Sequence, residues 1–148
     1  MSITVFCTDL TEHVADTVKA VRLEDGTTAY EYVAKSDWNK LYICQAGAVN
    51  ANALKGKKSI SFDIMLTEDT TADAFALRIK PNPTAEQVPG ISNGYLYFGE
   101  SYTGDRKVVK GEWKTVTIDI SSYADGCTEF AIYLFAGTTA YVRNITIL

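Results

Sequence analysis

Histidine, proline and cysteine are scarce in this chain, which has one His, three Pro and three Cys among its 148 residues. The only histidine, His13, stands in a polar stretch without an evident serine or cysteine partner, which argues against a catalytic triad. Cys7, Cys44 and Cys127 are far apart, form no Cys-x-x-Cys pair and cannot all pair within one chain. We interpret them as small apolar residues on strands, and a bridge through Cys7 or Cys44 stays open.

Excess positive charge and long apolar runs are also lacking. The chain has 14 Lys and Arg against 18 Asp and Glu, so no basic face is expected that could release counterions from nucleic acid. No apolar run is long enough to cross a bilayer, and the first ten residues lack the basic start and apolar centre of a signal peptide, so no membrane partner is expected and any secretory leader would already be removed. Length and composition predict a single globular domain over residues 1–148.

Apolar and polar side chains alternate along many segments of the sequence. No window shows apolar residues at sustained helical spacing. Turn residues separate the alternating segments, and Asp25-Gly26 is the strongest hairpin signal among them. The segment 80–94 holds all three prolines and is predicted to be a long surface loop. The number and spacing of segments predict an all-β chain, a β-sandwich of two antiparallel sheets. The predicted strands are 3–7, 18–24, 27–34, 40–45, 58–66, 73–80, 94–100, 112–120, 128–136 and 140–148.

The alternation also assigns each strand residue to a face, because side chains two apart point the same way. One set of apolar side chains is predicted to fill the core. The set comprises Ile60, Phe62, Ile64, Leu66, Phe75, Leu77, Ile79, Val116, Ile118, Ile120, Phe130, Ile132 and Leu134. The opposite face of 112–120 is Thr and Asp, whereas that of 128–136 carries Tyr133 and Phe135. Outward aromatic side chains of this size need either a cover or a ligand.

The C-terminal third contains the successive segments "GEWKTVTIDIS", "FAIYLFAG" and "YVRNITIL". Their order resembles the closing strands of jelly-roll β-sandwich carbohydrate-binding modules, and "LKGKKSISFDIML" resembles a central strand of such modules. The resemblance covers about the last two thirds of the chain. It implies a non-catalytic, extracellular and monomeric domain that binds polysaccharide and is attached to a plant-cell-wall glycoside hydrolase or to cellulosomal modules.

The jelly-roll resemblance also implies which strands share a sheet. Strands 112–120 and 140–148 would lie in one sheet, and 73–80, 94–100 and 128–136 in the other. Trp113 would then be an anchor at the start of a strand rather than a sugar contact. Many such modules have an Asp-Asn or Asp-Asp pair in the last strand beside a structural calcium, but this chain has Arg143-Asn144 there. An arginine is a poor neighbour for a hard dication, so no cofactor is expected, although Asp9, Glu12 and Asp25 could supply oxygens.

A sugar ring presents a face of C–H bonds and a girdle of hydroxyls, so its site needs flat aromatic surface and fixed hydrogen-bond groups. The residues that alternation and loop context select for this task are Trp38, Tyr42, Arg78, Tyr95, Tyr97, Tyr133 and Phe135. Arg78 can equally be part of a solvated exterior, and packing under a loop is the alternative for Tyr133 and Phe135. The expected ligand is a single chain of β-glucan or of a decorated relative such as xyloglucan, bound in a groove with an affinity on the order of micromolar.

Two other functions stay open. A jelly-roll glycosidase would need two carboxylates facing one cleft, but Asp63, Glu100, Glu112 and Glu129 form no paired motif. A structural or adhesion jelly roll, such as a viral or phage surface domain or a protein-docking module, is the second alternative. Binding without release of reducing sugar would separate the module from the enzyme, and absence of any binding would favour the structural domain.

Overall fold

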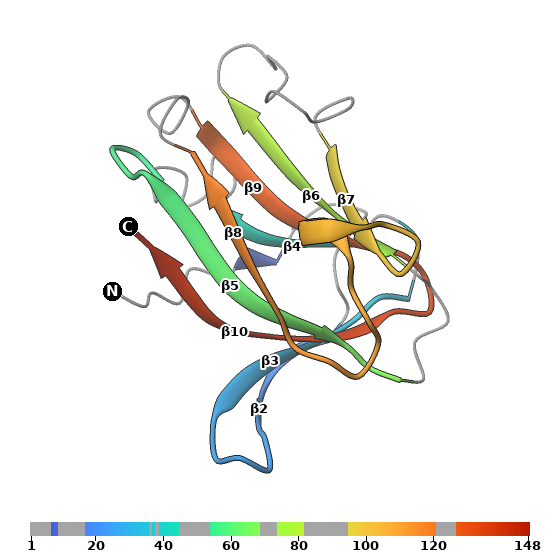
Figure 1. Ribbon diagram of the computed structural model, residues 1–148. Coiled ribbons are helices and arrows are strands. Elements are labelled where there is room, and N and C mark those ends of the chain that lie inside the picture. The colour runs from blue at the N-terminus through green and yellow to red at the C-terminus, as the bar shows by residue number, and fades with distance from the viewer. Residues whose placement is uncertain are drawn as a thin grey trace.

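In the part of the chain that the structure describes, ten strands form two antiparallel sheets that stack face to face (Figure 1). The computed structural model describes residues 7–8, 17–35, 37, 39–44, 54–68, 74–81, 95–120 and 127–148. Sheet I has the order β1 (Cys7–Thr8), β4 (Asn39–Cys44), β9 (Cys127–Leu134), β6 (Ala74–Pro81) and β7 (Tyr95–Gly99). Sheet II has the order β2 (Thr17–Arg22), β3 (Thr28–Val33), β10 (Thr139–Ile147), β5 (Ser59–Leu66) and β8 (Lys114–Asp119).

The all-β prediction is confirmed, since the one helical element in the described residues is the short 3-10 turn η1 (Gly104–Arg106) between β7 and β8. Among the residues that the structure describes, there is no helix with the length and apolar character of a membrane span. The strands β8, β9 and β10 alternate between sheet II and sheet I, as expected for a jelly roll. The predicted partition of strands between the sheets is therefore confirmed.

The core lies between the sheets and consists of the inward side chains of both. The strand β5 shows strict alternation, with Ile60, Phe62, Ile64 and Leu66 fully buried and the residues between them partly exposed. The predicted core residues Phe75, Leu77, Val116, Ile120, Phe130, Ile132 and Leu134 are buried in the same cluster. Ile118 packs against this cluster while only partly buried, and the side chain of Ile79 lies outside those described.

The predicted hairpin at Asp25-Gly26 joins β2 to β3. The Leu23 N–H donates to the Thr27 carbonyl at 2.8 Å, which closes a loop of three residues. Gly26 has a φ of 87°, a left-handed conformation that glycine adopts without the Cβ clash of other residues. The residues of this turn therefore determine the register of the hairpin, in which Arg22 pairs with Thr28 at the end of the two strands.

A β-bulge interrupts β10 where it pairs with β5. Arg143 pairs with Asp63, whereas Thr146 pairs with Ser61, so two residues of β10 face one residue of β5. Asn144 within the bulge has a φ of 56°, in the left-handed region that Asn tolerates better than most residues. The bulge shifts the inward positions by one residue, from Val142 before it to Ile145 after it, and leaves Arg143 and Asn144 outside the core.

The remaining sequence predictions fall partly outside the described residues. The predicted proline-rich loop begins within β6, whose last residue is Pro81, and residues 82–94 lie outside the described part. His13 and Trp38 also lie outside it.

Candidate functional site

The register of sheet I gathers three predicted site positions in one row across four strands. Tyr42 of β4 pairs with Ala131 of β9, Ala131 pairs with Arg78 of β6, and Arg78 pairs with Tyr95 of β7. Directly paired residues of antiparallel strands share a face of the sheet. The three positions, although separated by up to 53 residues in sequence, therefore form one row; their side chains lie outside those described.

A second row lies beside the first, two residues further along each strand. Tyr133 of β9 pairs with Lys40 of β4 and with Ala76 of β6, and Ala76 pairs with Tyr97 of β7. Tyr133, Ala76 and Ala131 form an apolar cluster separate from the main core, and the ring of Tyr97 packs against it. This separation confirms that Tyr133 points away from the core, on the outer face of sheet I.

The ring of Tyr133 is covered, however, with only 2% of the residue exposed. Its direct neighbours Ala76 and Ala131 have small side chains, so a large ring fits over them, and Tyr97 lies against it. The expectation that Tyr133 is open to a ligand is therefore not met in this structure. The Tyr133 side chain therefore lies beneath the accessible surface of this face, whereas Tyr97 is partly exposed.

Phe135 follows β9 directly and is half-buried in the turn that leads to β10. Its neighbour Ala136 donates its backbone N–H to the Asp37 carboxylate at 2.9 Å, and Leu134 pairs with Asn39. The chain around Phe135 is thus bonded to the segment between β3 and β4. Trp38 belongs to that segment but lies outside the described residues.

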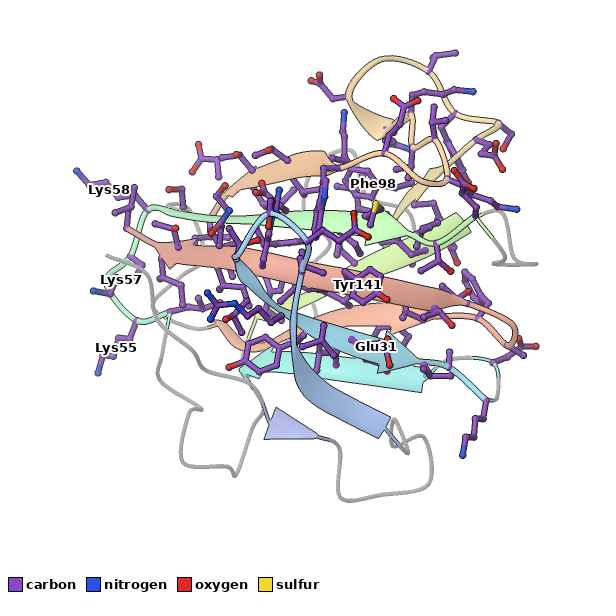
Figure 2. The ribbon with its side chains drawn as sticks, turned by 90° about the horizontal axis from the view of Figure 1, so that it is seen from below. Glu31, Lys55, Lys57, Lys58, Phe98 and Tyr141 are labelled. Carbon is purple, nitrogen blue, oxygen red and sulfur yellow. The ribbon has the colours of Figure 1, made fainter. Side chains whose placement is uncertain are left out.

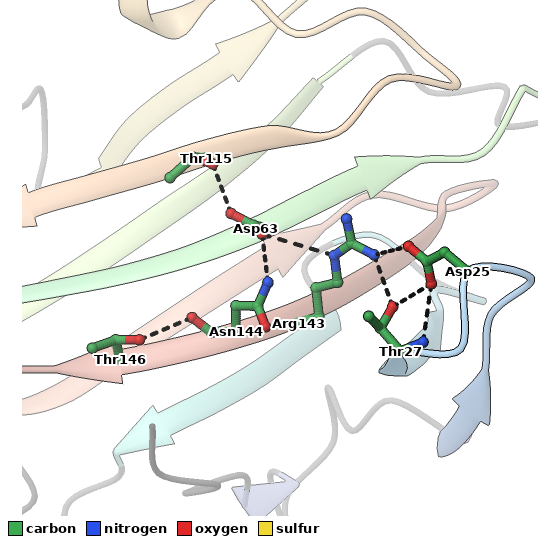
Figure 3. A network of polar contacts seen from close by, with 7 residues as sticks. All are labelled: Asp25, Thr27, Asp63, Thr115, Arg143, Asn144 and Thr146. Carbon is green, nitrogen blue, oxygen red and sulfur yellow. Dashed lines mark hydrogen bonds and ion pairs between the residues drawn. The ribbon is translucent and has the colours of Figure 1, made fainter. Parts of the chain in front are cut away.

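The outer face of sheet II carries a polar network centred on Arg143 (Figure 3). Its Nη1 donates to Asp25 Oδ2 at 3.0 Å and to Thr27 Oγ1 at 2.9 Å. Its Nε lies 3.7 Å from Asp63 Oδ2, a separation that allows charge attraction but no hydrogen bond. The guanidinium carbon is 3.7 Å from the ring centroid of Trp113, which is a cation–π contact. Trp113 therefore packs on sheet II at the start of β8, as predicted, and not on the face of sheet I.

Asn144 and Thr115 extend the network along the strands, and a separate pair lies beside it. Asp63 accepts hydrogen bonds from the Asn144 amide at 2.8 Å and from the Thr115 hydroxyl at 2.7 Å. On the next row, the Tyr141 hydroxyl donates to Glu31 at 3.2 Å, and Figure 2 shows the two side chains on neighbouring strands. The exposed polar face of sheet II is therefore internally hydrogen-bonded.

The network holds the pKa of Asp25 below its ordinary value. The Thr27 hydroxyl donates to Asp25 Oδ1 at 2.6 Å, the Thr27 N–H donates to the same atom at 3.0 Å, and Arg143 bonds to the other oxygen. These contacts, the Thr27 hydroxyl first, lower the pKa of Asp25 from 3.8 to about 2. Each contact favours the ionised form.

The residues around Arg143 do not fit a calcium ion. The guanidinium already supplies the positive charge between Asp25 and Asp63 and would repel a dication placed there. The described ranges contain no group of three His, Cys, Asp or Glu residues suited to a metal. Asp9 and Glu12 lie outside these ranges.

From the sequence, Arg143 was predicted only to be a poor neighbour for calcium, and Tyr141 was not among the predicted site residues. The carboxylate partners of Arg143 are 80 and 118 residues away, so no local pattern indicates them. The bulge that brings Arg143 and Asn144 to one face also breaks the alternation from which faces were assigned.

No protein-family model matches the chain, and no curated protein sequence matches it. Solved structures do share its fold. A Clostridium thermocellum xylanase 10B structure, described as CBM22-1 and GH10 modules with xylohexaose, superposes with a TM-score of 0.56 at 15% identity over 97% of this chain. An exo-β-agarase superposes with a TM-score of 0.56 at 10% identity over 100% of the chain. The chain spans only 26% of the xylanase chain and 23% of the agarase chain.

A whole carbohydrate-binding module is also similar in length. The family 11 carbohydrate-binding module of the cellulosomal cellulase Lic26A-Cel5E of C. thermocellum superposes with a TM-score of 0.54 at 16% identity, covering 99% of this chain and 88% of the module. Identities this low show a common fold, and they do not show that functional residues are shared. The chain has the jelly-roll β-sandwich fold found in carbohydrate-binding modules.

Proposed function

We propose that the chain is a non-catalytic module that binds plant cell-wall polysaccharide chains on the outer face of sheet I. The observation that carries the proposal is the strand register, which places Tyr42, Arg78 and Tyr95 in one row and Tyr97 in the next. The similar fold of a cellulase module supports the same reading. The ligand we propose is a β-glucan or a xyloglucan-like chain, since the protein carries a net charge of −4 and a neutral chain meets no repulsion.

The chemistry of this face suits a pyranose chain. Tyrosine rings offer flat area with little rotamer entropy, and their partly negative faces attract polarised C–H bonds. The planar guanidinium of Arg78 can donate to adjacent hydroxyls. We assign Trp38, Tyr42, Arg78, Tyr95, Tyr97 and Phe135 as contacts, with Tyr133 as the base on which Tyr97 packs.

The positions of Asp63 and Glu100, two of the carboxylates available for a glycosidase, support a non-catalytic role. Asp63 lies on sheet II and is bonded to Thr115 and Asn144. Glu100 pairs with Lys110 at 3.4 Å beyond the end of β7. A glycosidase needs two carboxylates across one cleft, and these two occupy different parts of the molecule. The proposed task is to hold an attached glycoside hydrolase or cellulosomal assembly on its substrate outside the cell.

Affinity electrophoresis tests the proposal. In native gels containing barley β-glucan or xyloglucan, the chain is expected to be retarded relative to a polysaccharide-free gel. We expect Arg78→Ala and Tyr97→Ala each to weaken binding about tenfold or more, because each removes one of few contacts. Tyr97 is a better test than Tyr133, since Tyr133→Ala would also leave a cavity and lower stability.

Tyr141→Ala is the matched control, because it removes a tyrosine from the outer face of sheet II. It should leave retardation unchanged. No retardation of the wild-type chain in any β-glucan would contradict the proposal and favour a structural or protein-docking jelly roll, a reading that the covered ring of Tyr133 also suits. Release of reducing sugar from these polysaccharides would instead indicate an enzyme.

A further inference from the structure

A cleft of about 460 Å³ lies at the open edge of the sandwich, between β7 of sheet I and β8 of sheet II. Its floor includes Leu96, Phe98 and Ile118, which face the interior of the sandwich. Leu96 and Phe98 alternate with Tyr95 and Tyr97, so the cleft lies on the opposite side of β7 from the candidate polysaccharide face. Its volume falls within the range typical of small-molecule sites, roughly 300–1,000 Å³.

One wall of the cleft is a turn held in place by backbone hydrogen bonds. The chain leaves β7, forms η1 and returns, so that the Val108 N–H donates to the Gly99 carbonyl at 3.1 Å. Within the turn, the Lys107 N–H donates to the Gly104 carbonyl at 3.1 Å. Val108 is buried in the core and anchors the returning chain. Arg106 on this turn is therefore presented to the cleft from a preorganised support.

The charged groups of the cleft favour an anion. Lys114 begins β8, lines the cleft and is half-buried, and its ammonium has no partner among the residues that the structure describes. Arg106 lines the facing turn, and its guanidinium carbon is 5.9 Å from the ring centroid of Tyr102. Asp105 is the one carboxylate among the lining residues, so two cations face one anion. An ammonium that lacks a partner among the described residues is stabilised when a ligand carboxylate bonds to it.

We propose that this edge cleft binds a uronate, a sugar unit that bears a carboxylate, independently of the neutral chain assigned to sheet I. The C–H face of the ring would pack on the partly exposed side chains of Leu96 and Ile118. The carboxylate would bond to Lys114 and Arg106, and Asp105 would accept a hydrogen bond from a sugar hydroxyl. The molecule would then bind an acidic sugar unit in the cleft between β7 and β8 and a neutral chain on the outer face of sheet I.

Titration with a matched pair of ligands tests the cleft. Methyl β-D-glucuronide and methyl β-D-glucoside differ in the carboxylate, and amide chemical shifts in the full chain report where each binds. We expect the glucuronide to shift the amides of residues 96–98, 105–106 and 114–118, and to bind about tenfold or more tightly than the glucoside. Lys114→Gln should weaken glucuronide binding about tenfold or more, and Lys114→Arg should retain most of it.

Lys55→Gln is the charge-matched control, since Lys55 projects from the turn before β5 at the other end of the molecule (Figure 2). It should leave the titration unchanged. Equal binding of glucuronide and glucoside, an unaltered titration of a folded Lys114→Gln variant, or acetate competing as well as the glucuronide would each overturn the proposal. Gels with neutral β-glucan report on sheet I alone, so failure of one proposal is distinguishable from failure of the other.

Discussion

Arg143 joins three parts of sheet II through a single guanidinium. It bonds to Asp25 and Thr27 in the β2–β3 loop, faces Asp63 on β5 and stacks on Trp113 before β8. An arginine suits this position because its planar, permanently charged group can bond at its edge and stack on its face at once. A lysine would keep the charge and lose the stacked plane.

The lowered pKa of Asp25 predicts an acid-dependent loss of stability. The pKa is about 2 in the folded chain and 3.8 as the reference value, so ionised Asp25 stabilises the folded state above about pH 4. This contribution is lost as the pH falls from about 4 through 2, because the unfolded chain then takes up the proton first. We expect the free energy of unfolding of Asp25→Asn to be lower than that of the wild type at pH 7, and the two to converge near pH 2.

Urea denaturation at several pH values measures this convergence. Glu24→Gln is the matched control, since it removes a carboxylate from the same hairpin loop and should show no such pH-dependent difference. A difference between Asp25→Asn and the wild type that stays constant from pH 5 to 2 would contradict the prediction.

The bulge in β10 determines which residues of this strand reach the outer face. Strict alternation would send Arg143 and Asn144 to opposite faces. With two residues of β10 facing one of β5, Asn144 donates to Asp63 from the same face on which Arg143 lies. The strand was predicted from its apolar pattern, but the bulge was not, because it depends on pairing with a strand about 80 residues earlier.

Substitutions of Asn144 separate the hydrogen bond from the backbone conformation. Asn144→Gly removes the bond to Asp63, which we expect to lower the free energy of unfolding by about 1 kcal/mol. Asn144→Ala removes the same bond and also places a Cβ without a polar group at a φ of 56°. The free energy of unfolding of Asn144→Ala should be about 1 kcal/mol lower than that of Asn144→Gly. Urea midpoints of the two variants provide the measurement, and equal midpoints would show that the bulge conformation is not strained for alanine.

The two sheets of the molecule present outer faces of different character. On sheet II the polar groups bond to one another, whereas on sheet I the register gathers tyrosines, small residues and Arg78. A hydrogen-bonded network contributes to stability, and an aromatic face can be used for binding. The molecule as a whole should therefore tolerate substitutions on the outer face of sheet II without loss of the proposed polysaccharide binding.

Trp113→Ala tests this division between the sheets. Loss of the cation–π contact and of the partly buried ring should lower the free energy of unfolding by about 1–2 kcal/mol. Retardation in β-glucan gels should be unchanged at temperatures where the variant is folded. If retardation is lost while the unfolding free energy is unchanged, Trp113 is a sugar contact and the assignment of the site to sheet I is wrong.

Local alternation was sufficient to predict most of the described strands, the inward residues of β5 and β9 and the face on which Tyr133 and Tyr97 lie, because side-chain direction repeats every two residues in a regular strand. Only the tertiary structure decided which strands are neighbours, and so which residues meet. It placed Tyr42, Arg78 and Tyr95 in one row, covered the ring of Tyr133 and surrounded Arg143 with two carboxylates. These contacts join segments far apart in the chain, and pairing across such distances depends on the packing of the whole sandwich rather than on any local pattern.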